Sequence, residues 1–424
     1  MTIMHELHDL MAFLDASPSP YHAVTSAAHR LDAAGFERVG EQADWTGVRS
    51  GYVVRGGALI AWRAPSAWSG TALPVRLVGA HTDSPGLRVK PRPDSGAYGW
   101  KQLGVEVYGG ALLNSWLDRD LGVAGRVVLS SGDEVLVNLQ EPLARVPQLA
   151  IHLDREVNER GLLLDKQQHL LPVWGTGNAT TGEFVALLAQ QSGLSDSSSI
   201  AAWDLCLYDL TPATVLGADR TLLASGRLDN QVSCWAAVHA LTNAPVENSV
   251  LAVVALFDHE EVGSESNTGA AGPLLEHALE RLFLAVGASR DVFLRSLATS
   301  LCVSADNAHA VHPNYPDRHE PGHRPMVNGG PAIKVNANQR YATSATIAVF
   351  FEQLCRRAEV PVQSFVSRNN MPCGSTIGPI TATRLGIPTV DVGVPQLSMH
   401  SARELCGTAD PSHLASVLRL FFTS

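Results

Sequence analysis

The chain has 424 residues, of which 45% are hydrophobic and 17% are charged, and its formal net charge is −10. This composition is typical of a globular protein and excludes a largely disordered chain, which would have fewer apolar residues and a higher net charge. The acidic balance argues against nucleic-acid or membrane-surface binding, because both need basic patches. The length predicts two or three domains.

Cysteine usage and hydropathy indicate the cellular compartment. The six cysteines are scattered and form no C-x-x-C pair, so neither a disulfide framework nor a thiolate zinc site is predicted. Residues 1–14 mix apolar and charged side chains, unlike the apolar core of a signal peptide. The longest apolar runs, such as 250–257, are far shorter than the roughly 20 residues of a membrane span. We therefore expect a cytoplasmic protein.

The first elements in the chain are two predicted helices followed by a buried strand. Helical periodicity covers about 3–14 and 21–35, and the second helix follows Ser17-Pro18-Ser19-Pro20, which is typical of a capped start. Residues 74–80 form a short apolar segment that predicts a strand, and turn-forming residues follow it. His81 is therefore expected at the carboxyl end of this strand.

The pattern changes to short segments of alternating character between about residues 88 and 224. Such segments predict β-strands at 105–113, 125–130, 134–140, 149–153 and 203–210. We expect residues 88–224 to form a β-rich domain inserted into a discontinuous core domain made of residues 1–87 and 225–424.

Strands and helices alternate after residue 225. Helices are predicted at 230–241, 272–285 and 344–358, and strands at 250–257, 301–304 and 388–392. This alternation predicts an α/β fold with a mixed, mostly parallel sheet, helices on both faces, and ligands bound at the carboxyl ends of the strands.

Five side chains lie where a predicted strand ends or a helix begins: His81, Asp229, Glu261, Asp306 and His400. Nitrogen and carboxylate ligands without thiolates suit zinc, manganese or cobalt. Two imidazoles and three carboxylates can give each of two ions one histidine and one carboxylate, with the third carboxylate bridging. Taken singly, each residue is more often a helix cap or a turn residue, so the hypothesis of a hydrolytic two-metal site depends on the whole set.

Two further carboxylates are candidates for catalytic roles. Glu260, beside a ligand but not itself one, is the predicted general base that takes a proton from water and passes it to the leaving amine. Asp83, two residues after His81, is expected to orient that imidazole. The chain contains no H-E-x-x-H, G-x-S-x-G, P-loop or G-x-G-x-x-G motif.

These segments resemble the motifs of the aspartyl aminopeptidase family of dinuclear metallopeptidases, over nearly the whole chain. The matching segments are 80–85, 226–230, 257–264, 304–310 and 398–404. The resemblance implies a zinc-peptidase-like fold and two divalent ions, with zinc favoured and manganese or cobalt as alternatives. It also implies that Asp229 bridges the ions, and that the enzyme removes N-terminal residues, preferably Asp or Glu, from peptides.

The resemblance further assigns roles in substrate binding and assembly. Lys334 is expected to face the acidic side chain of the substrate, although taken alone it would be an ordinary surface lysine. His152, from the β-rich domain, is expected to enter a neighbouring subunit's active site rather than to bind metal. The residues His309, Tyr341 and Met371 are expected to line the substrate pocket. The family implies a homo-oligomer, a dodecamer built from dimers, in which residues 88–224 make the dimer contacts.

Two alternatives stay open at this point. One is a glutamyl or leucyl aminopeptidase of a related dinuclear family, which uses similar ligands. The other is a non-catalytic, metal-binding oligomeric scaffold. The Glu260–Glu261 pair argues against the scaffold, because a scaffold needs the ligand but not the base.

Overall fold

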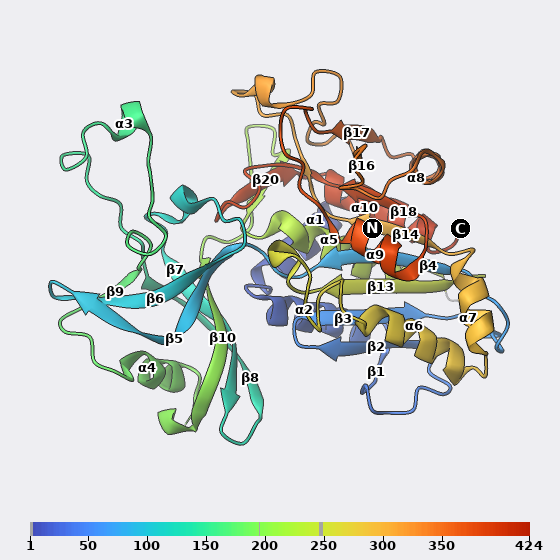
Figure 1. Ribbon diagram of the computed structural model, residues 1–424, viewed down its shortest axis with the longest axis horizontal. Helices are drawn as coiled ribbons and strands as arrows, with labels where there is room; N and C mark the ends of the chain where they lie inside the picture. The colour runs from blue at the N-terminus through green and yellow to red at the C-terminus, as the bar shows by residue number, and fades with distance from the viewer. Residues whose placement is uncertain (1–2, 195, 246–248) are drawn as a thin grey trace.

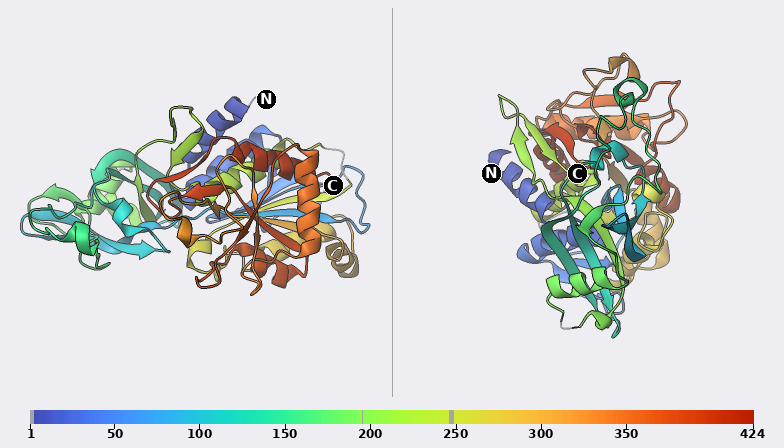
Figure 2. Two further views of the ribbon diagram at one scale, coloured as in Figure 1. Left: turned by 90° about the horizontal axis from the view of Figure 1, so that it is seen from above. Right: turned by 90° about the vertical axis from the view of Figure 1, so that its left-hand side faces the viewer.

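The computed structural model describes residues 3–194, 196–245 and 249–424. The strands of these residues form sheets of nine, six and five strands. Figure 1 shows a larger lobe, in which helices cover the nine-stranded sheet, and a smaller lobe built on the six-stranded sheet. The smaller lobe extends from one end of the larger one along the long axis of the molecule (Figure 2). Among the described residues, no helix is long and apolar enough to cross a membrane.

The nine-stranded sheet has the order β1-β2-β3-β13-β4-β14-β18-β16-β17. Five of its pairings are parallel and three are antiparallel, so the sheet is mixed and mostly parallel, as predicted. Its strands are β1 (Glu37–Arg38), β2 (Ser50–Arg55), β3 (Ala58–Arg63), β4 (Val75–His81), β13 (Leu251–Phe257), β14 (Leu301–Ala305), β16 (Ala332–Val335), β17 (Gln363–Val366) and β18 (Thr389–Gly393).

Helices cover both faces of this sheet, because its strands are apolar on both sides. In β4, Val78 and Ala80 point into one hydrophobic cluster and Val75 and Leu77 into the other, as the two-residue period of a strand requires. The first cluster is closed by α1 (Ile3–Asp15), α2 (Pro20–Ala33), α5 (Leu228–Thr242), α8 (Ala345–Arg357) and α10 (Asp410–Phe421). The second is closed by α6 (Leu274–Ala285), α7 (Arg290–Leu297) and α9 (Ile377–Leu385).

The predicted start of the second helix is confirmed. Ser19 is the N-cap residue of α2, where its hydroxyl accepts a hydrogen bond from the backbone N–H of His22, and Pro20 occupies the first turn. The sequence predictions did not include strands β1, β2, β3, β16 and β17 or helices α7, α9 and α10. The other predicted helices and strands of this lobe lie within a few residues of the observed ones.

The six-stranded sheet is antiparallel throughout, in the order β8-β7-β10-β5-β6-β9. Its strands are β5 (Gly86–Ala97), β6 (Trp100–Tyr108), β7 (Leu121–Leu129), β8 (Glu134–Ala144), β9 (Val173–Thr176) and β10 (Ile200–Asp209). Helix α4 (Glu183–Gln191), which was not predicted, buries Phe184 and Leu188 in the core of this lobe.

The strand predicted at 149–153 is wrong. These residues form turns beside α3 (Val157–Arg160) and pair with no strand of the described chain. Leu149 and Leu153 are 63% and 74% exposed. Alternation of apolar residues predicts a strand only where another strand is available to pair with it, and sequence alone does not say whether one is.

The five-stranded sheet lies where the two lobes meet and has the order β11-β12-β20-β19-β15. Its strands are β11 (Thr214–Leu216), β12 (Leu222–Ser225), β15 (Ala308–His309), β19 (Pro395–Leu397) and β20 (Glu404–Gly407). The division of the chain into domains at residues 88 and 224 stays a prediction.

Candidate active site

Three adjacent strands of the large sheet bring four of the candidate side chains together. Strands β13, β4 and β14 are neighbours and run parallel, so their carboxyl ends lie at the same edge. His81 is the last residue of β4, and Asp306 follows β14. Glu260 and Glu261 follow β13 in the short 3-10 helix η3 (Glu260–Val262).

The five-stranded sheet supplies the other two ligand candidates. Asp229 lies at the start of α5, after β12, and His400 lies in the turn between β19 and β20. Left-handed backbone conformations occur at Arg227 (φ 60°), His259 (φ 65°) and His400 (φ 66°). Such conformations are unfavourable for residues other than glycine and cluster at functional sites, so these turns are shaped by the surrounding structure.

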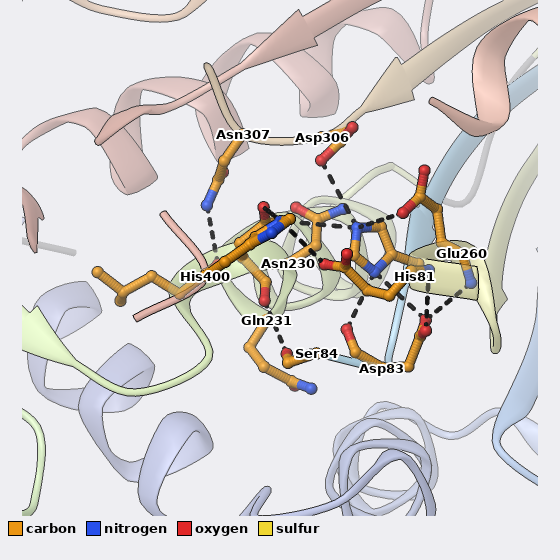
Figure 3. Close-up of polar contacts among 12 residues, drawn as sticks. His81, Asp83, Ser84, Asn230, Gln231, Glu260, Asp306, Asn307 and His400 are labelled. Atoms are coloured by element: carbon orange, nitrogen blue, oxygen red, sulfur yellow. Dashed lines mark hydrogen bonds and ion pairs between the residues drawn. The ribbon is translucent and has the colours of Figure 1, made fainter. Parts of the chain in front are cut away.

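Asp229 connects two groups of side chains. Its Oδ1 lies 3.4 Å from Nε2 of His81, and its Oδ2 lies 3.6 Å from Nε2 of His400. Asp306 Oδ1 is 3.5 Å from Nε2 of His81, and Glu261 Oε1 is 3.4 Å from Nε2 of His400. Figure 3 shows the His81 ring between Asp83 on one side and Asp306 on the other. Among the described residues, three three-residue groups could hold a metal ion. Two of them share the carboxylate of Asp229, and the third joins His81 with Glu260 and Glu261.

These donors fit divalent cations. Two ligands about 2.1 Å from a tetrahedral ion lie about 3.4 Å apart, which is the spacing found here. Oδ1 of Asp229 and Oε1 of Glu261 are buried without a hydrogen-bond partner. A buried carboxylate oxygen with no donor is costly unless a cation compensates it, so the site is built for positive charge.

The pKa values of the two histidines also indicate a negative electrostatic potential at this site. Burial lowers the pKa of His81, but the carboxylates of Asp229 and Asp306 outweigh burial and raise it well above the usual value. For His400, burial is likewise outweighed, by Asp229 and Glu261, and the pKa rises to about 10. Metal binding replaces protons on such ligands, so the same carboxylates that hold protons here would favour a divalent ion.

Glu260 lies beside the cluster but outside the two groups that share Asp229. Its Oε2 is 4.0 Å from Nε2 of His81. Burial raises the pKa of Glu260 to about 7; the His81 ring opposes this shift and the Asp306 carboxylate adds to it. A nearby cation would lower this value by the same Coulomb interaction. A largely buried carboxyl group beside the ligand candidates is positioned to transfer protons.

Asp83 is fully buried and holds three residues of the cluster. Its Oδ1 accepts the backbone N–H of Glu260 and its Oδ2 that of Glu261, both at 3.1 Å. Nδ1 of His81 lies 3.0 Å from the backbone carbonyl oxygen of Asp83 and 3.4 Å from its Oδ1. Asp83 thus contacts both His81 and the turn that carries the two glutamates, and its orienting role stays a prediction.

Glu404 is a residue of the site to which the sequence interpretation gave no role. It is buried on β20, where Oε1 accepts the backbone N–H of His400 at 2.7 Å and Oε2 accepts that of Asp229 at 2.9 Å. Burial, followed by the negative charge of Asp229, raises the pKa of Glu404 to about 8. Only the pairing of β20 with β12, which aligns Glu404 with Ser225, brings it to Asp229, and no local pattern signals that pairing.

The three residues expected to line the substrate pocket do share one cavity. This cavity, of about 310 Å³, is lined by His309, Tyr341 and Met371. Ser398 and Met399, which precede His400, also line it, so the cavity opens beside the metal-ligand cluster.

Lys334 lies next to the ligand candidates, whereas His152 lies away from them. Lys334, on β16, is 2% exposed, and its Nζ donates to Oδ2 of Asp306 and to the carbonyl oxygen of Asn307, each at 3.2 Å. It is therefore not the surface lysine that its type alone suggests. His152 lies in an exposed turn shortly before α3, and it belongs to none of the possible metal-binding groups found among the described residues.

Known proteins share both the sequence and the architecture of this chain. A family model described as "Aminopeptidase I zinc metalloprotease (M18)" matches residues 13–422. The chain belongs to the M18 family of aminopeptidases. It is therefore a metalloaminopeptidase, a peptide hydrolase, and the resemblance seen in its motifs is confirmed at that level.

Relatives and solved structures extend this assignment over the whole length. The chain is 56% identical over 418 residues to "Probable M18 family aminopeptidase 2" of Streptomyces avermitilis, covering 97% of this chain and 96% of the relative. The Mycobacterium tuberculosis H37Rv protein of the same description is 48% identical over 428 residues, covering 98% of each chain.

Among solved structures, one in a complex of Ape4 and Nbr1 is 37% identical, with a TM-score of 0.94, covering 99% of this chain and 86% of that one. Another, the S. cerevisiae mApe1 dodecamer, is 29% identical, with a TM-score of 0.85, covering 99% and 97%. These likenesses confirm the predicted fold class.

Proposed function

We propose that this M18 aminopeptidase hydrolyses peptides with two divalent metal ions bridged by Asp229. The observation that carries the proposal is that the two oxygens of one buried carboxylate face the two histidine rings, at 3.4 and 3.6 Å. His81 and Asp306 would complete one site, and His400 and Glu261 the other. Zinc is the favoured ion, with manganese and cobalt as alternatives.

The bound ions would polarise the scissile carbonyl and make water more acidic. Glu260 takes one proton from the attacking water as its oxygen bonds to the carbonyl carbon. It delivers that proton to the leaving amine nitrogen as the C–N bond breaks. Asp83 keeps Glu260 in place by accepting its backbone N–H, so that the carboxyl group faces the reacting atoms.

We infer a preference for N-terminal aspartate or glutamate. The cavity lined by His309, Tyr341 and Met371 also carries the guanidinium groups of Arg318 and Arg368, against the single carboxylate of Glu320. A positive balance of this kind favours an acidic side chain even in a protein of net charge −10. Lys334 adds a buried positive charge next to Asp306, at the boundary between the metal ligands and this cavity.

We also infer a homo-oligomer, built from dimers through residues 88–224 and dodecameric like mApe1. The apolar side chains of Leu149, Ile151 and Leu153 are exposed around His152, and contact with another subunit would cover them. His152 would then reach a neighbouring active site. The cytoplasmic location expected from the sequence stays a prediction.

Glu260→Gln tests the proposed catalytic role. The amide keeps the shape of the side chain but carries no proton between water and amine, so kcat should fall by about 10²–10⁴ while metal content is unchanged. Turnover of an aspartyl amide and elemental analysis of the same sample measure both. Exposed Glu265, in the same loop, provides the control variant Glu265→Gln. Near-normal turnover by a metal-loaded Glu260→Gln enzyme would exclude this role.

Lys334→Met tests the basis of substrate preference. Methionine keeps most of the volume and removes the charge. If Lys334 attracts the acidic side chain, kcat/KM should fall at least about tenfold more for aspartyl and glutamyl amides than for a leucyl amide. An equal loss for all three amides, together with weaker metal binding, would mean that Lys334 only holds Asp306. Lys101→Met, which removes the partner of Glu183 in the smaller lobe, is the control.

A further inference from the structure

A segment of the smaller lobe contacts both halves of the proposed metal centre. Residues 108–115, here called the 108–115 segment, begin at the last residue of β6 and run into the short 3-10 helix η1 (Leu113–Trp116). β6 belongs to the six-stranded sheet, whereas every proposed metal ligand comes from the nine-stranded or the five-stranded sheet and their loops. The segment is thus a contribution of one lobe to the site of the other.

Tyr108 contacts the half that contains His81. Its side chain is buried, and its hydroxyl donates to Oδ2 of Asp83 at 2.7 Å. That carboxylate accepts the backbone N–H groups of both glutamates after β13. It also lies 3.4 Å from Nδ1 of His81, which makes a shorter contact, of 3.0 Å, with the backbone carbonyl oxygen of Asp83. The Arg88 guanidinium lies 3.7 Å from the centre of the tyrosine ring and packs on its face. Tyr108 therefore restrains Asp83, which in turn restrains His81.

Gly110 contacts the half that contains His400. Its carbonyl oxygen lies 3.1 Å from Nδ1 of His400. A carbonyl can only accept, so Nδ1 carries the proton and Nε2 is left to face Asp229 and Glu261. The backbone of the segment is also hydrogen-bonded to the backbone of His400, because the N–H of Leu112 donates to the carbonyl of His400 at 2.9 Å. The position of the segment thus determines the orientation and tautomer of this imidazole.

Gly109 lets the segment approach this closely. It has φ +66°, and a Cβ built there would lie 3.1 Å from Cβ and 3.2 Å from the carbonyl oxygen of Glu261. A larger residue would be strained and would push against the proposed ligand. Ser115 anchors the far end of the segment, where its hydroxyl accepts the N–H of Ala402 at 2.8 Å.

We propose that the 108–115 segment is a positioning element for the metal centre. Tyr108 sets His81 through Asp83, and Gly110 sets His400 directly, so the two ligand groups reach their working geometry only with the smaller lobe in place. The inference rests on the proposed two-metal function, and it gives the smaller lobe a task within its own chain besides any contact between subunits.

Tyr108→Phe tests the proposal, because it removes one hydroxyl and little else. Outer partners of metal ligands typically change metal affinity or activity by about 10–100-fold when removed. We expect a loss of this size in kcat or in the affinity for one of two ions, with KM little changed. The absorption spectrum of the cobalt-loaded protein should also shift. Chelator competition with zinc measures affinity independently of activity.

Tyr52→Phe is the matched control. Tyr52 is buried, and its hydroxyl also donates to a carboxylate oxygen at 2.7 Å, that of Asp32, between β2 and α2. It should alter thermal stability only. The positioning role is overturned if Tyr108→Phe behaves like Tyr52→Phe, with the cobalt spectrum, metal affinity and kcat of the parent enzyme.

Metal stoichiometry separates this inference from the proposed function. A parent enzyme that binds a single ion would exclude the two-metal function, while an effect of Tyr108→Phe on that ion would still support positioning. Ser115→Ala is a second test. It removes the anchor of the segment on the His400 side only, so it should weaken zinc binding without changing the contact of Tyr108 with Asp83. An unchanged zinc affinity, cobalt spectrum and kcat in both variants would exclude the positioning role.

Discussion

The larger and smaller lobes differ in where they keep their charges. In the larger lobe and the five-stranded sheet, charged side chains are buried in numbers: Arg63, His81, Asp83, Asp229, Asp258, Asp306, Lys334, Asp391, Glu404 and Asp410. In the described part of residues 88–224, Asp209 is the only charged residue buried to that degree. Asp209 pairs with Arg119, and other ion pairs of the smaller lobe lie at its surface, as with Arg145 and Asp120, which are 48% and 63% exposed.

This difference indicates that the buried charges of the larger lobe serve binding rather than stability. Burying a charge costs free energy unless a partner compensates it. Repeated burial of charges therefore adds little to the stability of a fold. Several of the buried carboxylates gather at the strand ends, where burial raises the pKa values of Glu260 and Glu261 and two oxygens lack donors, which indicates a site suited to binding cations. The smaller lobe instead relies on an apolar core and contacts the site through the 108–115 segment.

Among variants that test this comparison between the lobes, the largest effect is expected for Glu404→Gln. An amide has one acceptor oxygen, so the N–H of either Asp229 or His400 would face an NH₂ group. Metal affinity or kcat should fall by about 10–100-fold, measured by zinc competition and turnover. The control from the smaller lobe is Glu134→Gln, where exposed Glu134 accepts two bonds from Arg126. Equal losses in the two variants would contradict the comparison between lobes.

An intermediate effect is expected from Asp410, a buried carboxylate away from the metal cluster. Burial raises its pKa to about 7, although the N–H groups of Asn328 and Gly330 donate to it. An unfolded aspartate has a pKa of about 3.9. At pH values between these two pKa values, the folded protein therefore binds more protons at this residue than the unfolded chain does. The contribution of Asp410 to stability should therefore fall as pH rises from about 4 to about 7, by at most about 4 kcal/mol.

Unfolding of the parent and of Asp410→Asn across this pH range measures the contribution. The stability advantage of the parent over the variant should shrink with rising pH and level off above about 7. Exposed Asp133, between β7 and β8, supplies the control Asp133→Asn, which should show no such trend. A difference between parent and Asp410→Asn that is constant with pH would contradict the prediction.

The smallest effect is expected for Arg145→Ala. Arg145 pairs with Asp118 and Asp120 at the surface of the smaller lobe, and exposed pairs of this kind contribute about 1 kcal/mol or less. The melting temperature should change little. Arg63→Ala is the contrast, because buried Arg63 donates to the carbonyl of Ala244 and packs on Phe36. An Arg145 variant as unstable as the Arg63 variant would weaken the comparison.

Much of the core could be predicted because its patterns are local. The apolar run of β4 ends at a turn, so His81 was expected at a carboxyl end, and Ser19 before Pro20 predicted the start of α2. The prediction failed at 149–153, where alternating apolar residues lie exposed in a turn. It also missed α4, whose apolar residues are buried by contacts with strands distant in sequence.

The sequence by itself determined which residue types carry the chemistry and which of them stand at the ends of elements. Only the tertiary structure decided that β13, β4 and β14 are neighbours, that the oxygens of Asp229 divide between two histidines, and that Glu404 and Tyr108 hold the ligands. The physical reason is that strand order and side-chain contacts depend on burial across the whole chain. Helix starts and strand ends depend on a few neighbouring residues, which a sequence displays directly.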